Sequence, residues 1–208
     1  MVDRAISKFL DSVLNTLLKW PLVLVFIYFS PELFHYFMSS IRSLTNIDSY
    51  LYIIGAVIFF ISEFRYGNKF LTLEHELTHA IFCFFTFKEN IRIDMNPPPE
   101  SGALGLCKYN GGTNWLISLA PYFFPTLTIF ISLLYLLPIQ NYYFLLDLCL
   151  GYSIAFHLKT NFMEFKANMN SQLKNMQTDI ESAGKYFSIL ILPFLNLLTF
   201  SLIFRLIS

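Results

Sequence analysis

One short motif gathers the side chains that could do chemistry, His75-Glu76-Leu77-Thr78-His79. On a helix, residues four apart return to nearly the same face, because 400° exceeds one turn by only about 40°. Both imidazoles can therefore bind one Zn²⁺ ion, and Glu76 can act as general base on a water molecule at the metal. The metal would lower the pKa of that water toward about 7 and polarise a carbonyl. The motif therefore indicates a hydrolytic zinc site.

The segment that carries the motif is otherwise apolar. Residues 71–87 read LTLEHELTHAIFCFFTF. Charged side chains within an apolar span are costly and usually serve a function. Membrane di-iron sites need several histidine boxes, and this chain has only four histidines. A single Zn²⁺ with an Asp or Glu as third ligand is the metal site that this composition allows.

The composition excludes several classes of protein. Of the 208 residues, 55% are hydrophobic and 13% are charged, whereas a soluble domain carries about 25% charged residues. A single core of this size buries only about 70% of the surface of the chain, so a soluble or disordered protein is excluded. The net charge of zero gives no basic patch for nucleic acid, and the three widely spaced cysteines suggest no disulfide framework. An integral membrane protein is expected, and the Phe, Ile, Asn and Lys usage is typical of a bacterial cell membrane protein from an AT-rich organism.

The fold class predicted is all-α, a polytopic membrane protein with about six transmembrane helices, an N-terminal amphipathic helix and a short β-hairpin insertion. Residues 1–19 place apolar side chains at helical spacing, which predicts a helix on the bilayer surface or packed on the protein itself. This segment also lacks the compact apolar core of a cleavable signal peptide. Residues 20–208 are expected to form a single transmembrane catalytic domain. Its apolar segments lie at about 20–38, 50–64, 71–87, 114–137, 142–158 and 186–206.

Prolines and turn residues interrupt these segments. The first span is expected to be kinked near Pro31, and the fourth near Pro121 and Pro125. Residues 88–113 contain two strand-like stretches, IRID and ALGLCKY, around MNPPPESG, which predicts a hairpin. Residues 159–185 are predicted to form a polar loop.

At this point the chain resembles the site-2 protease family of intramembrane zinc metalloproteases, as a divergent and minimal member. The resemblance rests on HELTH inside an apolar span, then a hairpin-like insertion, the Pro-containing NWLISLAPYFFP and a downstream Asp, and it covers about residues 65–205. It implies hydrolysis of a peptide bond in or near a transmembrane segment of a protein substrate, and a hairpin that clamps an extended substrate. The usual downstream Asn-Pro…Asp-Gly motif of the family is absent, which leaves the third ligand open.

Two aspartates compete to be that third ligand. Asp179, in NMQTDIESAG, resembles the polar-Asp-small segment of the membrane-embedded branch of the family and is favoured, although an Asp there could also be a helix N-cap. Asp147, in LLDLCLG, lies within an apolar span and could instead be a hydrogen-bonded structural acid. His157 could orient Asp179, stabilise an oxyanion, bind the metal or be structural. The expected site therefore comprises Glu76 and His157 as catalytic residues and His75, His79 and Asp179 as zinc ligands.

The function expected is an intramembrane zinc metalloendopeptidase with Glu76 as general base. Its expected partners are the lipid bilayer and a transmembrane protein or peptide substrate, and no nucleic acid. One alternative is a non-catalytic metal-binding membrane protein that binds membrane partners. Another is a surface metalloprotease, for which Glu164 is the loose candidate for a downstream Glu ligand. A transporter with a zinc site is disfavoured, because no internal repeat is visible.

Overall fold

The computed structural model describes residues 2–44, 49–62, 69–98, 104–170 and 178–208. These residues are mostly helical with one two-stranded sheet, which confirms the coarse fold prediction. In chain order the elements are α1 (Val2–Ser12), the π-helix η1 (Val13–Leu18), α2 (Lys19–Tyr28), α3 (Ser30–Leu44), α4 (Ser49–Ser62), α5 (Lys69–Phe85), β1 (Glu89–Asp94), β2 (Leu106–Asn110), α6 (Trp115–Phe123), α7 (Thr126–Leu134), the 3₁₀-helix η3 (Gln140–Tyr142), α8 (Tyr143–Asn170), α9 (Asp179–Ala183) and α10 (Lys185–Ile207).

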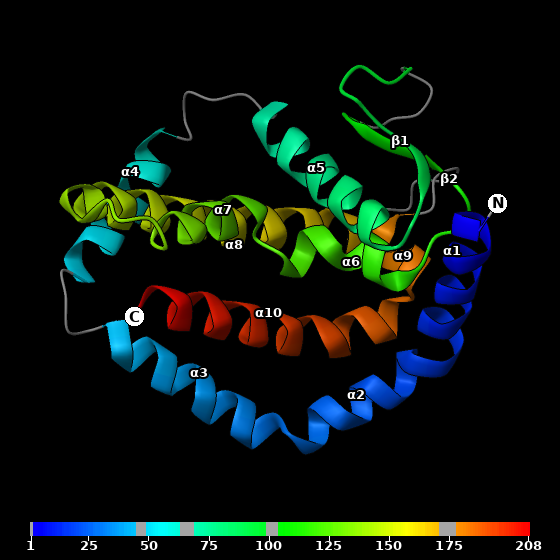
Figure 1. Cartoon of the computed structure of the whole chain (residues 1–208), viewed down its shortest axis with the longest axis horizontal. Coiled ribbons are helices and arrows are strands. Elements are labelled where there is room, and N and C mark those ends of the chain that lie inside the picture. Colours follow the sequence, from blue (N-terminus) through cyan, green and yellow to red (C-terminus); the bar gives the residue numbers. More distant parts are fainter. Residues whose placement is uncertain (1, 45–48, 63–68, 99–103, 171–177) are drawn as a thin grey trace.

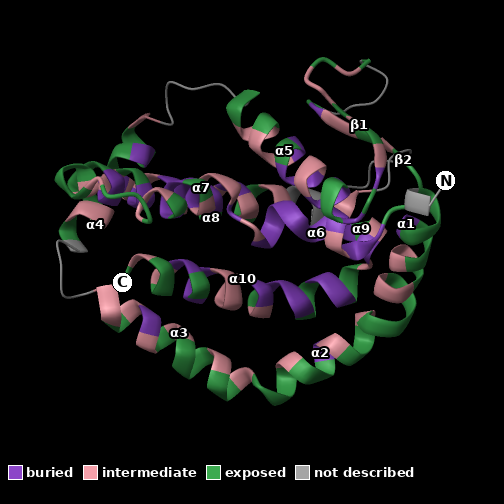
Figure 2. Cartoon of the chain, in the orientation of Figure 1, coloured by how far each residue is buried: buried purple, intermediate pink, exposed green. Residues whose placement is uncertain are grey.

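The helices are arranged around α10. In Figure 1, α1, α2 and α3 form an arc along one side of α10, and α6, α7 and α8 lie along the other. Buried residues are concentrated in α6 and α10, while α2 and α3 are mostly exposed (Figure 2). The largest core cluster joins α5, α6, α9 and α10, and its most buried members are Cys83, Leu119, Ala120, Ile180 and Ile191. This core packs against one face of the helix that carries the HELTH motif, through Phe82 and Cys83.

The number of membrane-spanning helices is smaller than predicted. Within the described ranges, two helices are long and apolar enough to cross a membrane, Arg4–Tyr28 and Lys185–Ile207. The pair α6 and α7, bent by 63°, would add a third if it counts as one span. The prediction of about six is therefore not met. α4 and α5 have 14 and 17 residues, whereas about 20 are needed to span the hydrocarbon core.

The break in the first apolar segment follows from Pro31. The helix stops at Phe29, and α3 begins at Ser30. Pro31 has no N–H to donate to the carbonyl of Ile27, four residues earlier. The Ser30 hydroxyl donates to that carbonyl instead, at 2.8 Å. The kink expected near Pro31 is thus present, two residues before the proline.

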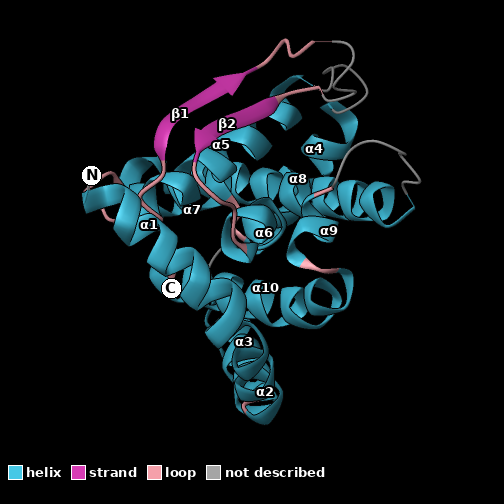
Figure 3. Ribbon diagram, turned by 90° about the vertical axis from the view of Figure 1, so that its right-hand side faces the viewer, coloured by secondary structure: helices cyan, strands magenta, loops and turns pink. Residues whose placement is uncertain are grey.

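The predicted hairpin is present, and its strands pair in antiparallel register (Figure 3). Ile93 pairs with Cys107 and Glu89 with Asn110, with a bulge between Glu89 and Arg92. Lys108 donates to Asp94 across the pair at 2.8 Å, which holds the pKa of the Asp94 carboxyl below its usual range. Residues 99–103, in the connection between the strands, lie outside the described residues.

Helix α1 turns the polar residues Ser7 and Asp11 inward. The Lys88 side chain is fully buried and donates to Ser7 at 3.0 Å and to both carboxylate oxygens of Asp11 at 2.6 Å. Asp11 also accepts a hydrogen bond from Asn114, at 2.8 Å. The apolar residues Ile6 and Phe9 of α1 are 38% and 68% exposed, and Leu17 in the following η1 is 65% exposed. In a soluble protein the apolar face of such a helix would be the buried one.

Two boundaries differ from the sequence prediction. The expected boundary between an interfacial helix at 1–19 and a span from residue 20 falls inside a continuous helical run, because α1, η1 and α2 follow one another without a break. The polar loop expected at 159–185 is helical at both ends of its described part. Its first twelve residues continue α8, and α9 lies within its last part; residues 171–177 lie outside the described residues. Lysine and glutamate side chains in this stretch made it look like a loop, but they are compatible with a helix that extends past the apolar core.

Helices α4 and α8 approach one another at backbone distance. A Cβ atom added to Gly55 would overlap the carbonyl of Leu148, and one added to Gly151 would overlap the carbonyl of Tyr52. Only glycine fits at such a contact, which is typical of helix pairs packed through small residues in membranes.

Candidate metal centre

Helices α5 and α9 bring three possible metal ligands together. The Nε2 atom of His75 lies 3.1 Å from the Nε2 atom of His79, on the same face of α5. One carboxylate oxygen of Asp179, Oδ2, lies 3.2 Å from the first nitrogen and 3.3 Å from the second. The expected ligands His75, His79 and Asp179 therefore form one group that could hold a metal ion.

The spacing of these three atoms fits a tetrahedral zinc site. Zinc bonds of about 2.0–2.1 Å at tetrahedral angles place neighbouring ligand atoms about 3.3 Å apart. The three measured separations are 3.1, 3.2 and 3.3 Å. The donor set of two imidazoles and one carboxylate is also one that zinc takes in hydrolytic sites, with the fourth position left open.

The second ring nitrogen of His79 is held by a carbonyl that a proline leaves free. His79 Nδ1 donates to the carbonyl of Ile117 in α6, at 2.9 Å. In an uninterrupted helix that carbonyl would accept the N–H of residue 121, but residue 121 is Pro121 and has none. The proline predicted to interrupt this segment therefore leaves an acceptor that fixes the orientation of His79.

The second ring nitrogen of His75 is held by a carboxylate. His75 Nδ1 donates to Glu164 of α8, at 2.6 Å. Metal-binding histidines usually donate their other N–H to a carboxylate or a carbonyl, which fixes the tautomer and the ring orientation. Glu164 thus contacts Nδ1 of His75, whereas Nε2 faces the other two candidate ligands. In the structure Glu164 is not part of the ligand group, unlike the alternative in which it binds the metal.

These hydrogen bonds determine which atoms face the centre of the group. A neutral imidazole has one N–H, and in both histidines the carboxylate or carbonyl acceptor places it on Nδ1. Both Nε2 atoms then present lone pairs to each other and to the Asp179 carboxylate. Three electron-pair donors at this spacing repel one another unless a cation, either protons or a metal ion, lies between them.

Asp179 is free to face the histidines because another residue caps its helix. The N-cap of α9 is Thr178, whose hydroxyl accepts the N–H of Glu181 while the Glu181 side chain accepts the N–H of Thr178. The interpretation of Asp179 as a simple N-cap is therefore wrong. Gly184, at φ 97°, ends the helix in a conformation that favours glycine and begins α10.

Glu76 lies between this group and strand β2. Its side chain is buried and interacts electrostatically with His79, His75 and Asp179. The backbone of Cys107 in β2 is a hydrogen-bonding partner of its carboxylate. Gly105, just before β2, packs against Thr72 and Glu76 so closely that a Cβ atom would overlap the Thr72 methyl group. The hairpin therefore runs directly past the residue expected to be the general base.

Two sequence-selected residues lie elsewhere. Asp147 is buried and accepts a 2.6 Å hydrogen bond from the Tyr135 hydroxyl, as a structural acid would. His157 is buried against Phe200, and its Nε2 lies 2.8 Å from the Asn161 amide. No contact of His157 within the described part of the chain reaches the ligand group.

Three contacts near the site were not identified from the sequence, namely those of Glu164 with His75, of the carbonyl freed by Pro121 with His79, and of Glu74 with the start of α7. The Glu74 carboxylate, one residue before His75, lies next to the backbone of Thr126 and Leu127, and its Oε1 atom is buried without a hydrogen-bond partner among the described residues. Thr126 and Leu127 are the first two residues of α7, whose N–H groups have no partner within the helix. Glu74 thus lies against the start of α7 after the bend. Buried polar residues in an apolar sequence were the available signal, but their partners are far away in the chain.

Glu164→Gln is expected to weaken metal binding about 10- to 100-fold without abolishing it, because loss of an outer-shell carboxylate typically has this effect. The glutamine keeps the size of the side chain but replaces the charged acceptor. The dissociation constant would be measured by competition with a chromophoric chelator. Glu32→Gln on α3 is the matched control. An unchanged dissociation constant in Glu164→Gln would show that this contact does not support the metal ligand.

Comparison with known proteins adds no relative. No family model, no curated protein and no solved structure matches this chain.

Proposed function

We propose that this chain is an intramembrane zinc metalloprotease that hydrolyses a peptide bond in or beside a transmembrane segment of another protein. The observation that carries the proposal is the ligand group itself. The Nε2 atoms of His75 and His79 and one Asp179 oxygen are separated by the distances expected in a tetrahedral zinc site. The Nδ1 atom of each histidine is hydrogen-bonded, and the buried Glu76 lies next to the group. The resemblance of the HELTH segment to the site-2 protease family supports the same reading.

The residues have distinct roles in this proposal. His75, His79 and Asp179 would hold the Zn²⁺ ion, while Glu164 and the Ile117 carbonyl keep the two imidazoles in position. Zn²⁺, when bound, lowers the pKa of water and polarises a carbonyl. Glu76 accepts a proton from the attacking water on its carboxylate and donates it to the leaving amine, as a general base and then a general acid.

The hairpin provides a means of presenting the substrate. A peptide bond in a helix is shielded, because its carbonyl is hydrogen-bonded within the helix. An extended segment can instead pair with the edge of a strand. β2 runs beside Glu76, so a chain segment aligned along β2 would pass the ligand group. The two candidate membrane-spanning helices are consistent with a membrane location for this reaction.

Metal content is the first test of the proposal. The detergent-purified protein is expected to contain about one zinc per chain by elemental mass spectrometry, and His79→Ala is expected to lose it, because removal of one of three ligands leaves an incomplete site. His35→Ala, the same change at an exposed histidine on α3, serves as the control. Absence of zinc from the wild-type protein after reconstitution would refute the proposed site.

A further inference from the structure

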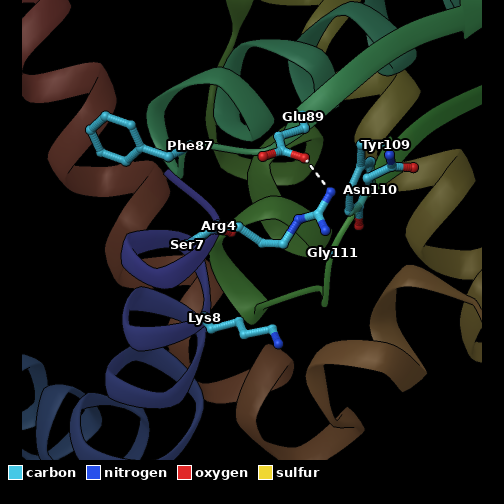
Figure 4. Close-up of a pocket in the computed structure, with 8 residues that line it drawn as sticks. All are labelled: Arg4, Ser7, Lys8, Phe87, Glu89, Tyr109, Asn110 and Gly111. Atoms are coloured by element: carbon cyan, nitrogen blue, oxygen red, sulfur yellow. Dashed lines mark hydrogen bonds and ion pairs between the residues drawn. The ribbon is translucent and has the colours of Figure 1, made fainter. Parts of the chain in front are cut away.

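A pocket lies on the molecule between α1 and the base of the hairpin. It is lined by Arg4, Ser7, Lys8, Phe87, Glu89, Tyr109, Asn110 and Gly111. Figure 4 shows the Arg4 side chain reaching from α1 toward Glu89, with Lys8 one turn along the same helix. None of these residues belongs to the ligand group, so the pocket is separate from the proposed metal centre.

The charge of the pocket favours an anion. Arg4 and Lys8 supply two positive charges, and Glu89 is the one acid that lines it. Arg4 pairs with Glu89 at 2.8 Å, but the two side chains remain 64% and 33% exposed. Lys8 is exposed and has no hydrogen bond or ion pair with any described residue. Burial raises the pKa of the Tyr109 phenol to about 12, so the pocket wall gains no negative charge near neutral pH.

Exposed apolar side chains flank the pocket, as expected for a protein surface that lies at the bilayer interface. The outward face of α1 carries the exposed residues Ile6 and Phe9. On the other side, the end of α5 and the residues after it expose Phe84, Phe85 and Phe87, at 71%, 63% and 48%. A pocket with two cations between two exposed apolar surfaces matches a phospholipid, whose phosphate lies directly above its acyl chains.

We propose that this pocket binds the phosphate of an anionic phospholipid headgroup, with Arg4 and Lys8 as its cationic partners and the acyl chains along Phe9 and Phe87. A lipid bound there would link α1 to the hairpin, since the pocket residues come from both. Gly111, at φ 114°, contributes no side chain that would fill the pocket. The proposal does not depend on the protease function.

The test is native mass spectrometry of the full chain in detergent with dioleoyl phosphatidylglycerol or dioleoyl phosphatidylcholine. We expect phosphatidylglycerol to bind more tightly, and Arg4→Gln and Lys8→Gln each to weaken its binding about fivefold, the effect of one basic residue near an anionic lipid surface. Lys69→Gln, with the same loss of charge at the start of α5, should bind like the wild type. Glu89→Gln should bind more tightly, because it removes the competing acid.

Three results would overturn the proposal. Equal binding of the two lipids would remove the preference for an anionic headgroup. Wild-type binding by both Lys8→Gln and Arg4→Gln would place the lipid elsewhere. Displacement of phosphatidylglycerol by millimolar inorganic phosphate would identify a general anion site rather than a lipid site. Glu89→Gln keeps the test valid if Arg4→Gln fails to fold, because its expected effect has the opposite sign.

Discussion

Glu76→Gln is expected to reduce peptide cleavage at least about 100-fold while the protein keeps its zinc. Removal of a general base typically costs 10²- to 10⁴-fold in rate. The amide of glutamine has nearly the same shape as the carboxylate but cannot accept the proton. Glu76 supplies none of the three candidate ligand atoms, so the Glu76→Gln variant should still bind zinc. Cleavage would be measured as new N-termini of membrane proteins in cells that express the wild type or Glu76→Gln, and zinc by elemental mass spectrometry.

Three other results would each contradict a different part of the proposed role of Glu76. Loss of zinc together with cleavage would make Glu76 a structural residue or a ligand. Wild-type cleavage would exclude it as the base. Zinc without cleavage in either protein would favour a metal-binding membrane protein with no protease activity. Glu32→Gln, the same change on α3, controls for general effects on expression and folding.

Asp179→Asn is expected to weaken zinc binding by more than about 100-fold, beyond the usual effect of an outer-shell change. The Asp179 oxygen lies 3.2 and 3.3 Å from the two Nε2 atoms, and an amide is a far poorer zinc ligand than a carboxylate. Thr178 and Glu181 cap α9 without Asp179, so the helix should remain folded. The measurement is the zinc dissociation constant by chelator competition, with circular dichroism as a check of helix content.

Asp147→Asn is the matched control for Asp179→Asn. Asparagine can still accept the hydrogen bond from Tyr135, and Asp147 is no part of the ligand group, so zinc binding should be unchanged. The loss of zinc affinity is expected to be largest in Asp179→Asn, smaller in Glu164→Gln and absent in Asp147→Asn. A loss of zinc in Asp147→Asn with wild-type binding in Asp179→Asn would reverse the assignment of the third ligand.

The hairpin and the ligand helix could be predicted because their signals are local. IRID alternates apolar and charged residues as strands do, and the turn residues of MNPPPESG separate it from ALGLCKY. HELTH needs only helical spacing to place two imidazoles on one face. The transmembrane count could not be predicted in the same way. Apolar segments were counted as spans, although α4 and α5 are too short and α6 and α7 are bent apart. Hydropathy measures how apolar a segment is, and it does not give the length of the helix that the segment forms.

The supporting residues could not be predicted because they act over long separations in the chain. His75 and Glu164 are 89 residues apart, and their contact depends on α8 continuing past its apolar part. A proline in a span predicts a kink, but the sequence does not show that the freed carbonyl of Ile117 will meet His79. The catalytic role of His157 stays a prediction. A polar residue in an apolar segment suggests catalysis, and its contacts in the structure are with Asn161 and Phe200.

The glycine contact between α4 and α8 makes the proposed metal site depend on residues that carry no functional groups. Gly151 and Glu164 belong to one helix and are about 20 Å apart along it. A side chain at Gly55 or Gly151 would force the two backbones apart and move α8, and with it the carboxylate that holds His75. Natural variation at these two glycines should therefore be constrained as tightly as at a ligand. In a set of homologous sequences, they would be as informative about the activity as the histidines.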